Sequence, residues 1–139
     1  MLHEKLLEKI YEHVALLDEA RKRRLHMGDT LSLYAVLHAL QVHAQAVIDY
    51  LLHTCAILGV SVETPIRCTQ RLEEEGLLER EEAELLRRLV RFRNLVVHEY
   101  GSIDVGRVRR VVESRGYLDA AEVVRRLHER LGARGLLDP

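Results

Sequence analysis

The sequence predicts an all-α protein, an antiparallel helical bundle with a four-helix up-and-down core and short additional helices. Two observations favour this class. The 139 residues include only two prolines, eight glycines and six aromatic residues, while 47% are hydrophobic and 31% are charged. Apolar residues also recur every three or four positions through several long segments, which is the period of an amphipathic helix. A β-sandwich or a disordered chain would have a different composition.

Two long helices are expected in the first half of the chain. The apolar positions of residues 2–26 are Leu6, Ile10, Val14 and Leu17. Gly28 is expected to end this helix, and Asp29 or Thr30 to cap the next one. Residues 31–58 alternate spacings of four and three throughout, at Leu33, Leu37, Leu40, Ala44, Val47, Leu51, Cys55 and Leu58. Such regularity is typical of a long helix that packs on neighbours at a small crossing angle.

The second half predicts one short helix, one long helix and one or two more. Residues 65–75 follow Thr64, a good N-cap, and begin with proline, which suits a first helical turn. Residues 80–100 open with glutamates and become basic, the polarity that the helix dipole favours. Residues 103–115 and 117–131 are expected to be helical as well.

We expect one domain over residues 1–139, with a core of about 1–131 and a C-terminal tail of 132–139. Twenty-one basic residues balance 22 acidic ones, for a net charge of −1, so any contact with nucleic acid must come from a local patch. The acidic and histidine residues near the N-terminus are unlike a signal peptide, and no uninterrupted apolar run approaches a membrane span. The expected protein is cytoplasmic, without a membrane partner.

The cysteines and histidines point to no metal or cofactor. Cys55 and Cys68 have no C-x-x-C spacing and make no disulfide framework, so two buried free thiols are expected. His38, His43 and His53 share one predicted helix, but their spacings of five and ten do not place them on one face. The prediction is therefore no metal and no cofactor.

The most informative segment lies in the predicted helix 80–100. Arg93 occupies the apolar stripe of that helix, where a guanidinium is costly unless it is paired or lines a cleft. Asn94 and His98 lie beside it, four residues apart, so their side chains can meet. The pattern indicates an anion site at an interface. The alternative is an arginine whose stem packs on the core while its head pairs with a glutamate.

The combination Arg93-x4-His98-x-Tyr100 is more specific than its parts. With eighteen arginines and eight histidines, chance predicts about one Arg-x4-His pair in this chain, and a second pair does occur at Arg21 and His26. Requiring tyrosine two positions after histidine lowers the expected number to about 0.04, and only the segment at 93–100 satisfies it.

On these residues the chain resembles the HEPN superfamily, and specifically the HepT-like toxins, whose signature is R-x4-H-x-Y. Flanking features fall in matching order over about residues 1–130, among them Asp49 and His53 in the long helix and the helix start at Pro65. The resemblance implies a HEPN-like helical bundle that forms a homodimer with two motifs facing one cleft. It implies metal-independent endoribonuclease activity on an RNA substrate. It also implies a cognate antitoxin, a minimal nucleotidyltransferase that transfers AMP to Tyr100.

The residue types suit that chemistry. His98 can exchange protons near neutral pH, and Arg93 offers a charged fork of donors to a phosphate. These two are the expected catalytic residues, with Asn94 and Tyr100 in support. Asp49 and His53, four apart, are a predicted polar pair that either supports the cleft or is merely intrahelical. Two other functions stay open: a non-catalytic binding or regulatory module that partners a nucleotidyltransferase, and a helical scaffold without any nucleotide connection.

Overall fold

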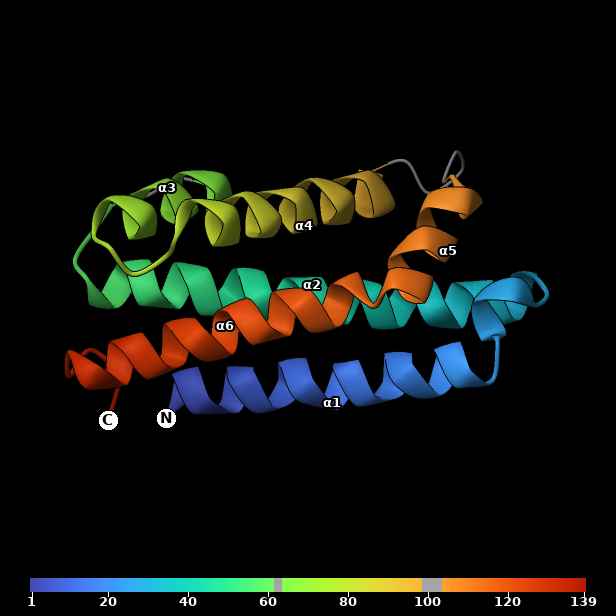
Figure 1. Cartoon of the computed structure of the whole chain (residues 1–139), viewed down its shortest axis with the longest axis horizontal. Helices are drawn as coiled ribbons and strands as arrows, with labels where there is room; N and C mark the ends of the chain where they lie inside the picture. Colours follow the sequence, from blue (N-terminus) through green and yellow to red (C-terminus); the bar gives the residue numbers. More distant parts are fainter. Residues whose placement is uncertain (62–63, 99–103) are drawn as a thin grey trace.

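The computed structural model describes residues 1–61, 64–98 and 104–139, with the side chains of 96–98 outside the description. Over these ranges the chain is entirely helical (Figure 1). In chain order the elements are α1 (Leu2–Lys22), the 3-10 helix η1 (Leu25–Met27), α2 (Thr30–Ile57), α3 (Pro65–Glu74), α4 (Arg80–His98), α5 (Val105–Ser114) and α6 (Gly116–Ala133). The predicted fold class is confirmed.

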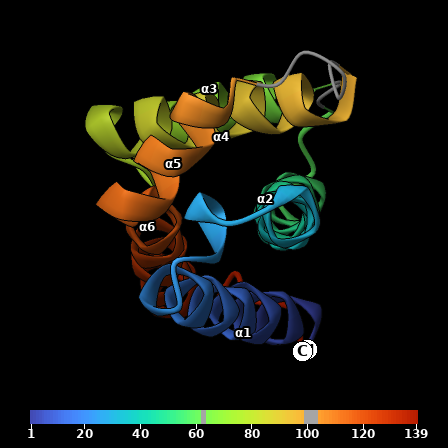
Figure 2. The same cartoon turned by 90° about the vertical axis from the view of Figure 1, so that its right-hand side faces the viewer.

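Four helices form the bundle. Helices α1, α2, α4 and α6 run up and down in turn, and the view along the bundle places them at its four corners (Figures 1 and 2). Helix α3 lies beside the start of α4, and the short α5 crosses at the opposite end. The two chain ends lie next to each other at the α3 end. The short connection between α1 and α2, residues 23–29, favours their antiparallel packing.

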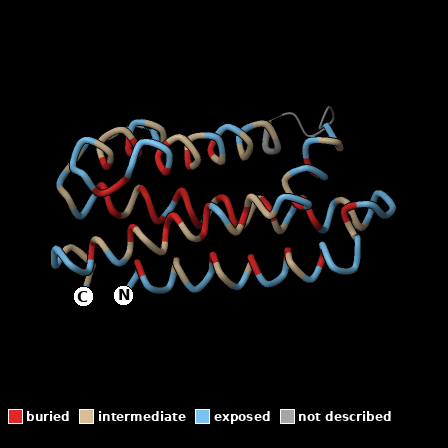
Figure 3. Tube along the Cα trace, viewed as in Figure 1, coloured by how far each residue is buried: buried red, intermediate tan, exposed pale blue. Residues whose placement is uncertain are grey.

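Helix α2 is the central element. Twelve of its residues are buried, and the buried positions of all four long helices face one another along the bundle axis (Figure 3). Residues 30–57 are also long and apolar enough to cross a membrane, but a core helix passes the same test. The apolar side chains of α2 are used inside this bundle, against α1, α3, α4 and α6.

Most predicted helix ends are confirmed. Asp29 caps α2 by accepting a hydrogen bond from the Ser32 amide at 2.8 Å, and Thr64 caps α3 by accepting from the Arg67 amide at 3.1 Å. The end of the first helix was predicted too late. Helix α1 stops at Lys22 because Arg24 takes a left-handed conformation (φ 57°), and η1 carries the chain to Gly28.

The prediction of two free thiols is wrong. Cys55 near the end of α2 and Cys68 in α3 form a disulfide across a sequence separation of 13, and both residues are fully buried. Helix α3 packs against α2, and the two Cα atoms lie 6.2 Å apart, within the range that a disulfide needs. Sequence spacing alone did not reveal this contact between α2 and α3.

Two ion-pair clusters fix α4 and α6. Glu82 is 5% exposed, accepts from Arg126 Nε at 2.8 Å and Arg130 Nη1 at 2.6 Å, and caps the start of α4 through the Glu79 amide. At the other end, Arg115 forms a two-point pair with Asp18 at 2.9 and 2.6 Å. The first cluster ties α4 to α6, and the second ties the α5–α6 junction to α1.

Candidate functional site

The predicted motif lies at the C-terminal end of α4. Arg93 and Asn94 belong to its last two turns, and His98 is its final residue. The side chain of His98 and the whole of Tyr100 lie outside the described residues. In an α-helix, five residues separate two positions by about 7.5 Å along the axis. Arg93 and His98 therefore belong to the same helix, close to its C-terminal end.

Arg93 is held by two amide oxygens. Its Nη2 donates to Oε1 of Gln45 on α2 at 2.5 Å, and its Nη1 donates to Oδ1 of Asn94 at 3.3 Å. The side chain is partly buried against α2. Gln45 in turn donates from Nε2 to Oδ1 of Asp49 at 2.8 Å. The result is a polar chain from α4 to α2 that fixes the guanidinium without placing a carboxylate on it.

This environment distinguishes Arg93 from the arginines that hold the fold. Arg115, Arg126 and Arg130 each contact a carboxylate at 2.6–2.8 Å. Within residues 1–61, 64–98 and 104–139, no ion pair includes Arg93. Because its acceptors among the described residues, Gln45 and Asn94, are neutral, neither cancels its positive charge, which stays available to an anion.

The predicted Asp49–His53 pair does not form. Asp49 is exposed and accepts from Gln45, so it is joined to Arg93 through one intervening side chain. His53 faces a different part of the molecule, with its Nε2 3.5 Å from Oδ2 of Asp138. The two residues are four apart, but Asp49 contacts Gln45 of the same helix, whereas His53 lies against the C-terminal tail.

A cavity of about 290 Å³ lies between helices of the bundle. It is lined by residues of α2, α4, α5 and α6, among them His43, Arg88, Phe92, Arg107 and Tyr117. Burial lowers the pKa of His43 to about 4, so this imidazole is neutral at pH 7. Arg93 is absent from the described lining, so this cavity and the Arg93–Gln45 contact are separate features of α4.

Comparison with known proteins matches residues 5–127 to the family model described as ribonuclease HepT-like. The chain belongs to the ribonuclease HepT-like family. A curated relative from Archaeoglobus fulgidus, named "Putative RNase", is 35% identical over 101 residues, covering 73% of this chain and 67% of the relative. The match spans α1 to most of α6, so the motif helix lies well inside the region that defines the family.

Solved structures share the HepT-like fold. A chain from the toxin–antitoxin MntA-HpeT mutant crystal structure superposes with a TM-score of 0.77 at 16% identity, covering 90% of this chain and 98% of that one. The cytosolic protein YutE of Bacillus subtilis superposes with a TM-score of 0.75, also at 16% identity, covering 99% and 93%. At such identities the likeness concerns the arrangement of the helices.

The sequence did not single out Gln45, which is the direct partner of Arg93. A glutamine in the middle of a long helix has no distinguishing pattern, and the contact joins residues 48 positions apart. The one available signal was indirect. Gln45 precedes Asp49 by four residues, a spacing that places both on one face of α2.

Proposed function

We propose that this chain is the toxin of a toxin–antitoxin pair and cleaves RNA as a metal-independent endoribonuclease. The observation that carries the proposal is Arg93, a partly buried arginine of the family motif whose hydrogen-bond acceptors are the amide oxygens of Gln45 and Asn94. A phosphate can accept hydrogen bonds from the remaining N–H groups of this guanidinium and is attracted by its positive charge. Membership of the ribonuclease HepT-like family and the curated relative support the same reaction class.

The reaction needs three catalytic contributions at the scissile phosphate. A base takes the proton of the ribose 2′-hydroxyl, an acid gives a proton to the leaving 5′-oxygen, and positive charge stabilises the phosphorane between them. Arg93 supplies the charge. His98 supplies the proton transfer, because histidine is the side chain suited to exchange protons near neutral pH. The products are a 2′,3′-cyclic phosphate and a free 5′-hydroxyl, so no water molecule is consumed in the cleavage step.

Two proton transfers from histidine require two motifs, and one chain carries one. We therefore place the active site between the α4 helices of a homodimer, with Asn94 orienting its neighbours. The cognate antitoxin is a minimal nucleotidyltransferase that transfers AMP to Tyr100, adding bulk and negative charge to the motif and repelling RNA. The solved toxin–antitoxin MntA-HpeT has the same fold, which supports a partner of this kind.

The experiment is cleavage of a fluorescent RNA by purified, tag-free protein in the presence of EDTA. Wild type should produce fragments with cyclic phosphate ends, and Arg93→Ala and His98→Ala should lose the activity by at least about a hundredfold. Arg80→Ala and His38→Ala are matched controls, because both side chains are exposed and lie outside the motif. The intact mass of the wild type establishes beforehand that Tyr100 carries no AMP.

Two outcomes would contradict the proposal. Full activity in His98→Ala would remove the proposed acid–base residue. A dimeric, unmodified wild type that leaves RNA intact would instead favour the second function, a non-catalytic module that binds and regulates a nucleotidyltransferase. Light scattering of the same preparation measures the dimer directly.

A further inference from the structure

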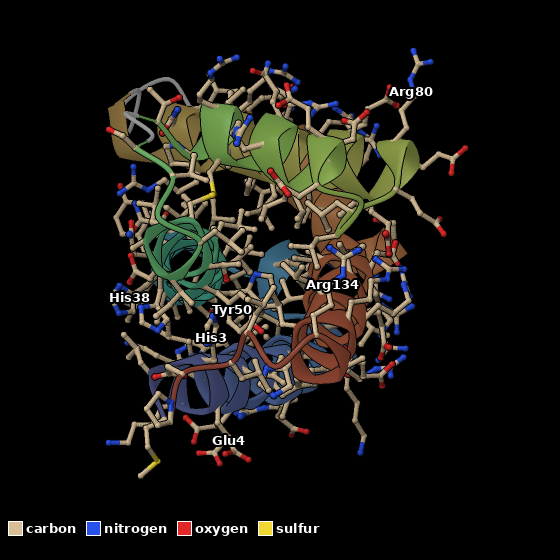
Figure 4. The ribbon with its side chains drawn as sticks, turned by 90° about the vertical axis from the view of Figure 1, so that its left-hand side faces the viewer. His3, Glu4, His38, Tyr50, Arg80 and Arg134 are labelled. Atoms are coloured by element: carbon tan, nitrogen blue, oxygen red, sulfur yellow. A yellow bond between two sulfur atoms is a disulfide. The ribbon has the colours of Figure 1, made fainter. Side chains whose placement is uncertain are left out.

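A second polar cluster lies at the end of the bundle where the chain termini meet. It joins His3 in the first turn of α1, His53 late in α2 and Asp138 in the C-terminal tail. One potential ligand atom from each residue lies within 4.8 Å of the other two. His3 is seen between α1 and α2, next to Tyr50, in the view onto this end of the molecule (Figure 4). None of these residues belongs to the motif of α4.

Hydrogen bonds fix the tautomer of His3. The hydroxyl of Thr54 donates its proton to the Tyr50 carbonyl at 2.8 Å, so at the 3.1 Å contact with His3 Nε2 the hydroxyl oxygen must accept. His3 Nε2 therefore carries a proton. In the neutral ring, Nδ1 then has a lone pair, and the backbone N–H of Asp138 points at it from 3.2 Å.

That lone pair faces a carboxylate. Nδ1 of His3 lies 2.9 Å from Oδ1 of Asp138, and two electron-rich atoms at this distance repel unless a cation lies between them. The ring is 1% exposed and cannot turn away to water. A protonated Nδ1 is one solution, and a metal ion is the other.

The third residue decides between these two solutions. Nε2 of His53 is buried and has no hydrogen-bond partner within the described part of the chain, although it lies 3.5 Å from Oδ2 of the same carboxylate. A proton shared between His3 and Asp138 does not satisfy it. A metal ion bound by all three groups does, because each nitrogen then donates its lone pair to the ion.

We propose that His3 Nδ1, His53 Nε2 and the Asp138 carboxylate form a binding site for a divalent transition-metal ion, with Zn²⁺ as the fitting representative. Two imidazoles and one carboxylate suit Zn²⁺ and similar ions, whereas Mg²⁺ and Ca²⁺ require mostly oxygen ligands. Three protein ligands leave one position of a tetrahedral ion for water. The bond from His3 Nε2 to Thr54 supplies the outer hydrogen bond that orients metal-binding histidines.

The carboxylate is already held in place for this role. Asp138 accepts from the Leu2 amide at 2.6 Å and the His3 amide at 3.1 Å, and the α-amino group of Met1 lies 2.9 Å from its Oδ1. The two amides anchor the tail while leaving lone pairs on both oxygens. Metal binding displaces the amino group and the weak backbone contact to Nδ1. The ion would then join α1, α2 and the tail, three segments up to 135 residues apart.

The test is Zn²⁺ titration of tag-free, chelator-stripped full-length protein by calorimetry, with Co²⁺ absorption as the report on coordination. We expect one Zn²⁺ per chain and the visible bands of a four-coordinate Co²⁺ ion. His53→Gln and Asp138→Asn should each weaken Zn²⁺ binding at least about a hundredfold, since even outer-shell changes cost 10- to 100-fold. His38→Gln is the matched control, an exposed histidine of the same helix, and should bind as wild type does.

His3→Gln is not used as the deciding variant, because a fully buried ring can be needed for folding. His53 and Asp138 are partly exposed, and circular dichroism checks that both variants are folded. Absence of stoichiometric Zn²⁺ uptake by folded wild type would overturn the proposal, as would unchanged Zn²⁺ affinity in His53→Gln. The site is independent of the proposed nuclease function, because neither readout involves RNA.

Discussion

Replacing Gln45 by glutamate tests whether the charge of Arg93 is what the nuclease uses. Gln45→Glu keeps the size of the side chain and keeps an oxygen at the 2.5 Å contact with Arg93 Nη2. It converts a neutral acceptor into a carboxylate, so Arg93 acquires the kind of partner that Arg115 and Arg126 already have. The guanidinium stays in place while its net charge towards a phosphate falls.

The magnitude follows from the geometry. Two unit charges about 4 Å apart interact by about 4 kcal/mol at an effective dielectric constant of about 20. Arg93 is only partly buried, so water screens part of this charge–charge energy. In Gln45→Glu, about 1–2 kcal/mol of the attraction between Arg93 and a phosphorane should be lost. That corresponds to a roughly 5- to 30-fold slower single-turnover cleavage of RNA.

Two further variants separate charge from position. Gln45→Met removes the acceptor but leaves Arg93 fully charged, and we expect less than about a fivefold loss. Gln70→Glu makes the same change in an exposed arginine–glutamine pair, Arg67 Nη1 to Gln70 Oε1 at 3.0 Å, and should cleave RNA like wild type. If Gln45→Glu is folded and cleaves as fast as wild type, the charge of Arg93 is not used. Equal losses in Gln45→Glu and Gln45→Met would show that Gln45 matters only for position.

Three other predictions concern stability and metal. Glu82→Gln should lower the free energy of unfolding by about 2–3 kcal/mol in urea titration, because it weakens the hydrogen bonds to Arg126 and Arg130. Burial raises the pKa of Glu82, but the hydrogen bonds from Arg130 and Arg126 outweigh it and hold this pKa below its ordinary value. The stability that the Glu82 carboxylate contributes is therefore present above its ordinary pKa of about 4.3 and disappears as the pH falls through the lower pKa of the folded state. Below about pH 4.3 the unfolding free energy of wild type should fall more steeply with pH than that of the variant. Parallel plots of unfolding free energy against pH would contradict this. Cys55→Ala/Cys68→Ala should lower the unfolding free energy by about 2–3 kcal/mol, since the disulfide closes a short loop, and alkylation without reductant should label neither cysteine of wild type. EDTA should lower the melting temperature of Zn²⁺-loaded protein but leave RNA cleavage at 25 °C unchanged, and loss of both would show that the cleavage reaction depends on a metal.

Local patterns predicted the helices well because each helix is specified within its own segment. The three- and four-residue spacings reflect burial on one face, and Asp29 and Thr64 cap the helices that follow them. The end of α1 was missed because Arg24, a residue without a strong turn preference, takes the left-handed conformation. The family motif was found for the same local reason, since its three residues lie within eight positions of the sequence.

Partners from distant segments could not be predicted in the same way. Arg93 donates to Gln45, and Cys55 forms a disulfide with Cys68. The first contact depends on how α4 packs against α2, and the second on how α3 packs against α2. The predicted Asp49–His53 pair failed because helical spacing permits a contact without requiring it. His53 instead meets Asp138, 85 positions away, in a tail predicted to lie outside the core. Leu136 and Leu137 pack on the core and bring that tail into place.

Helix α2 explains how one small bundle can hold two unrelated sites. Gln45 and His53 are eight residues apart, which separates them by roughly 12 Å along the axis and about 80° around it. The first therefore faces α4 and the second faces α1 and the tail. Because α2 is packed in the bundle between Val36 and Cys55, we expect it to stay in place when a metal ion binds at His53, so that the ion does not move Gln45. The two sites should couple only through global stability, so the proposed chelation experiment can separate them at a temperature well below unfolding.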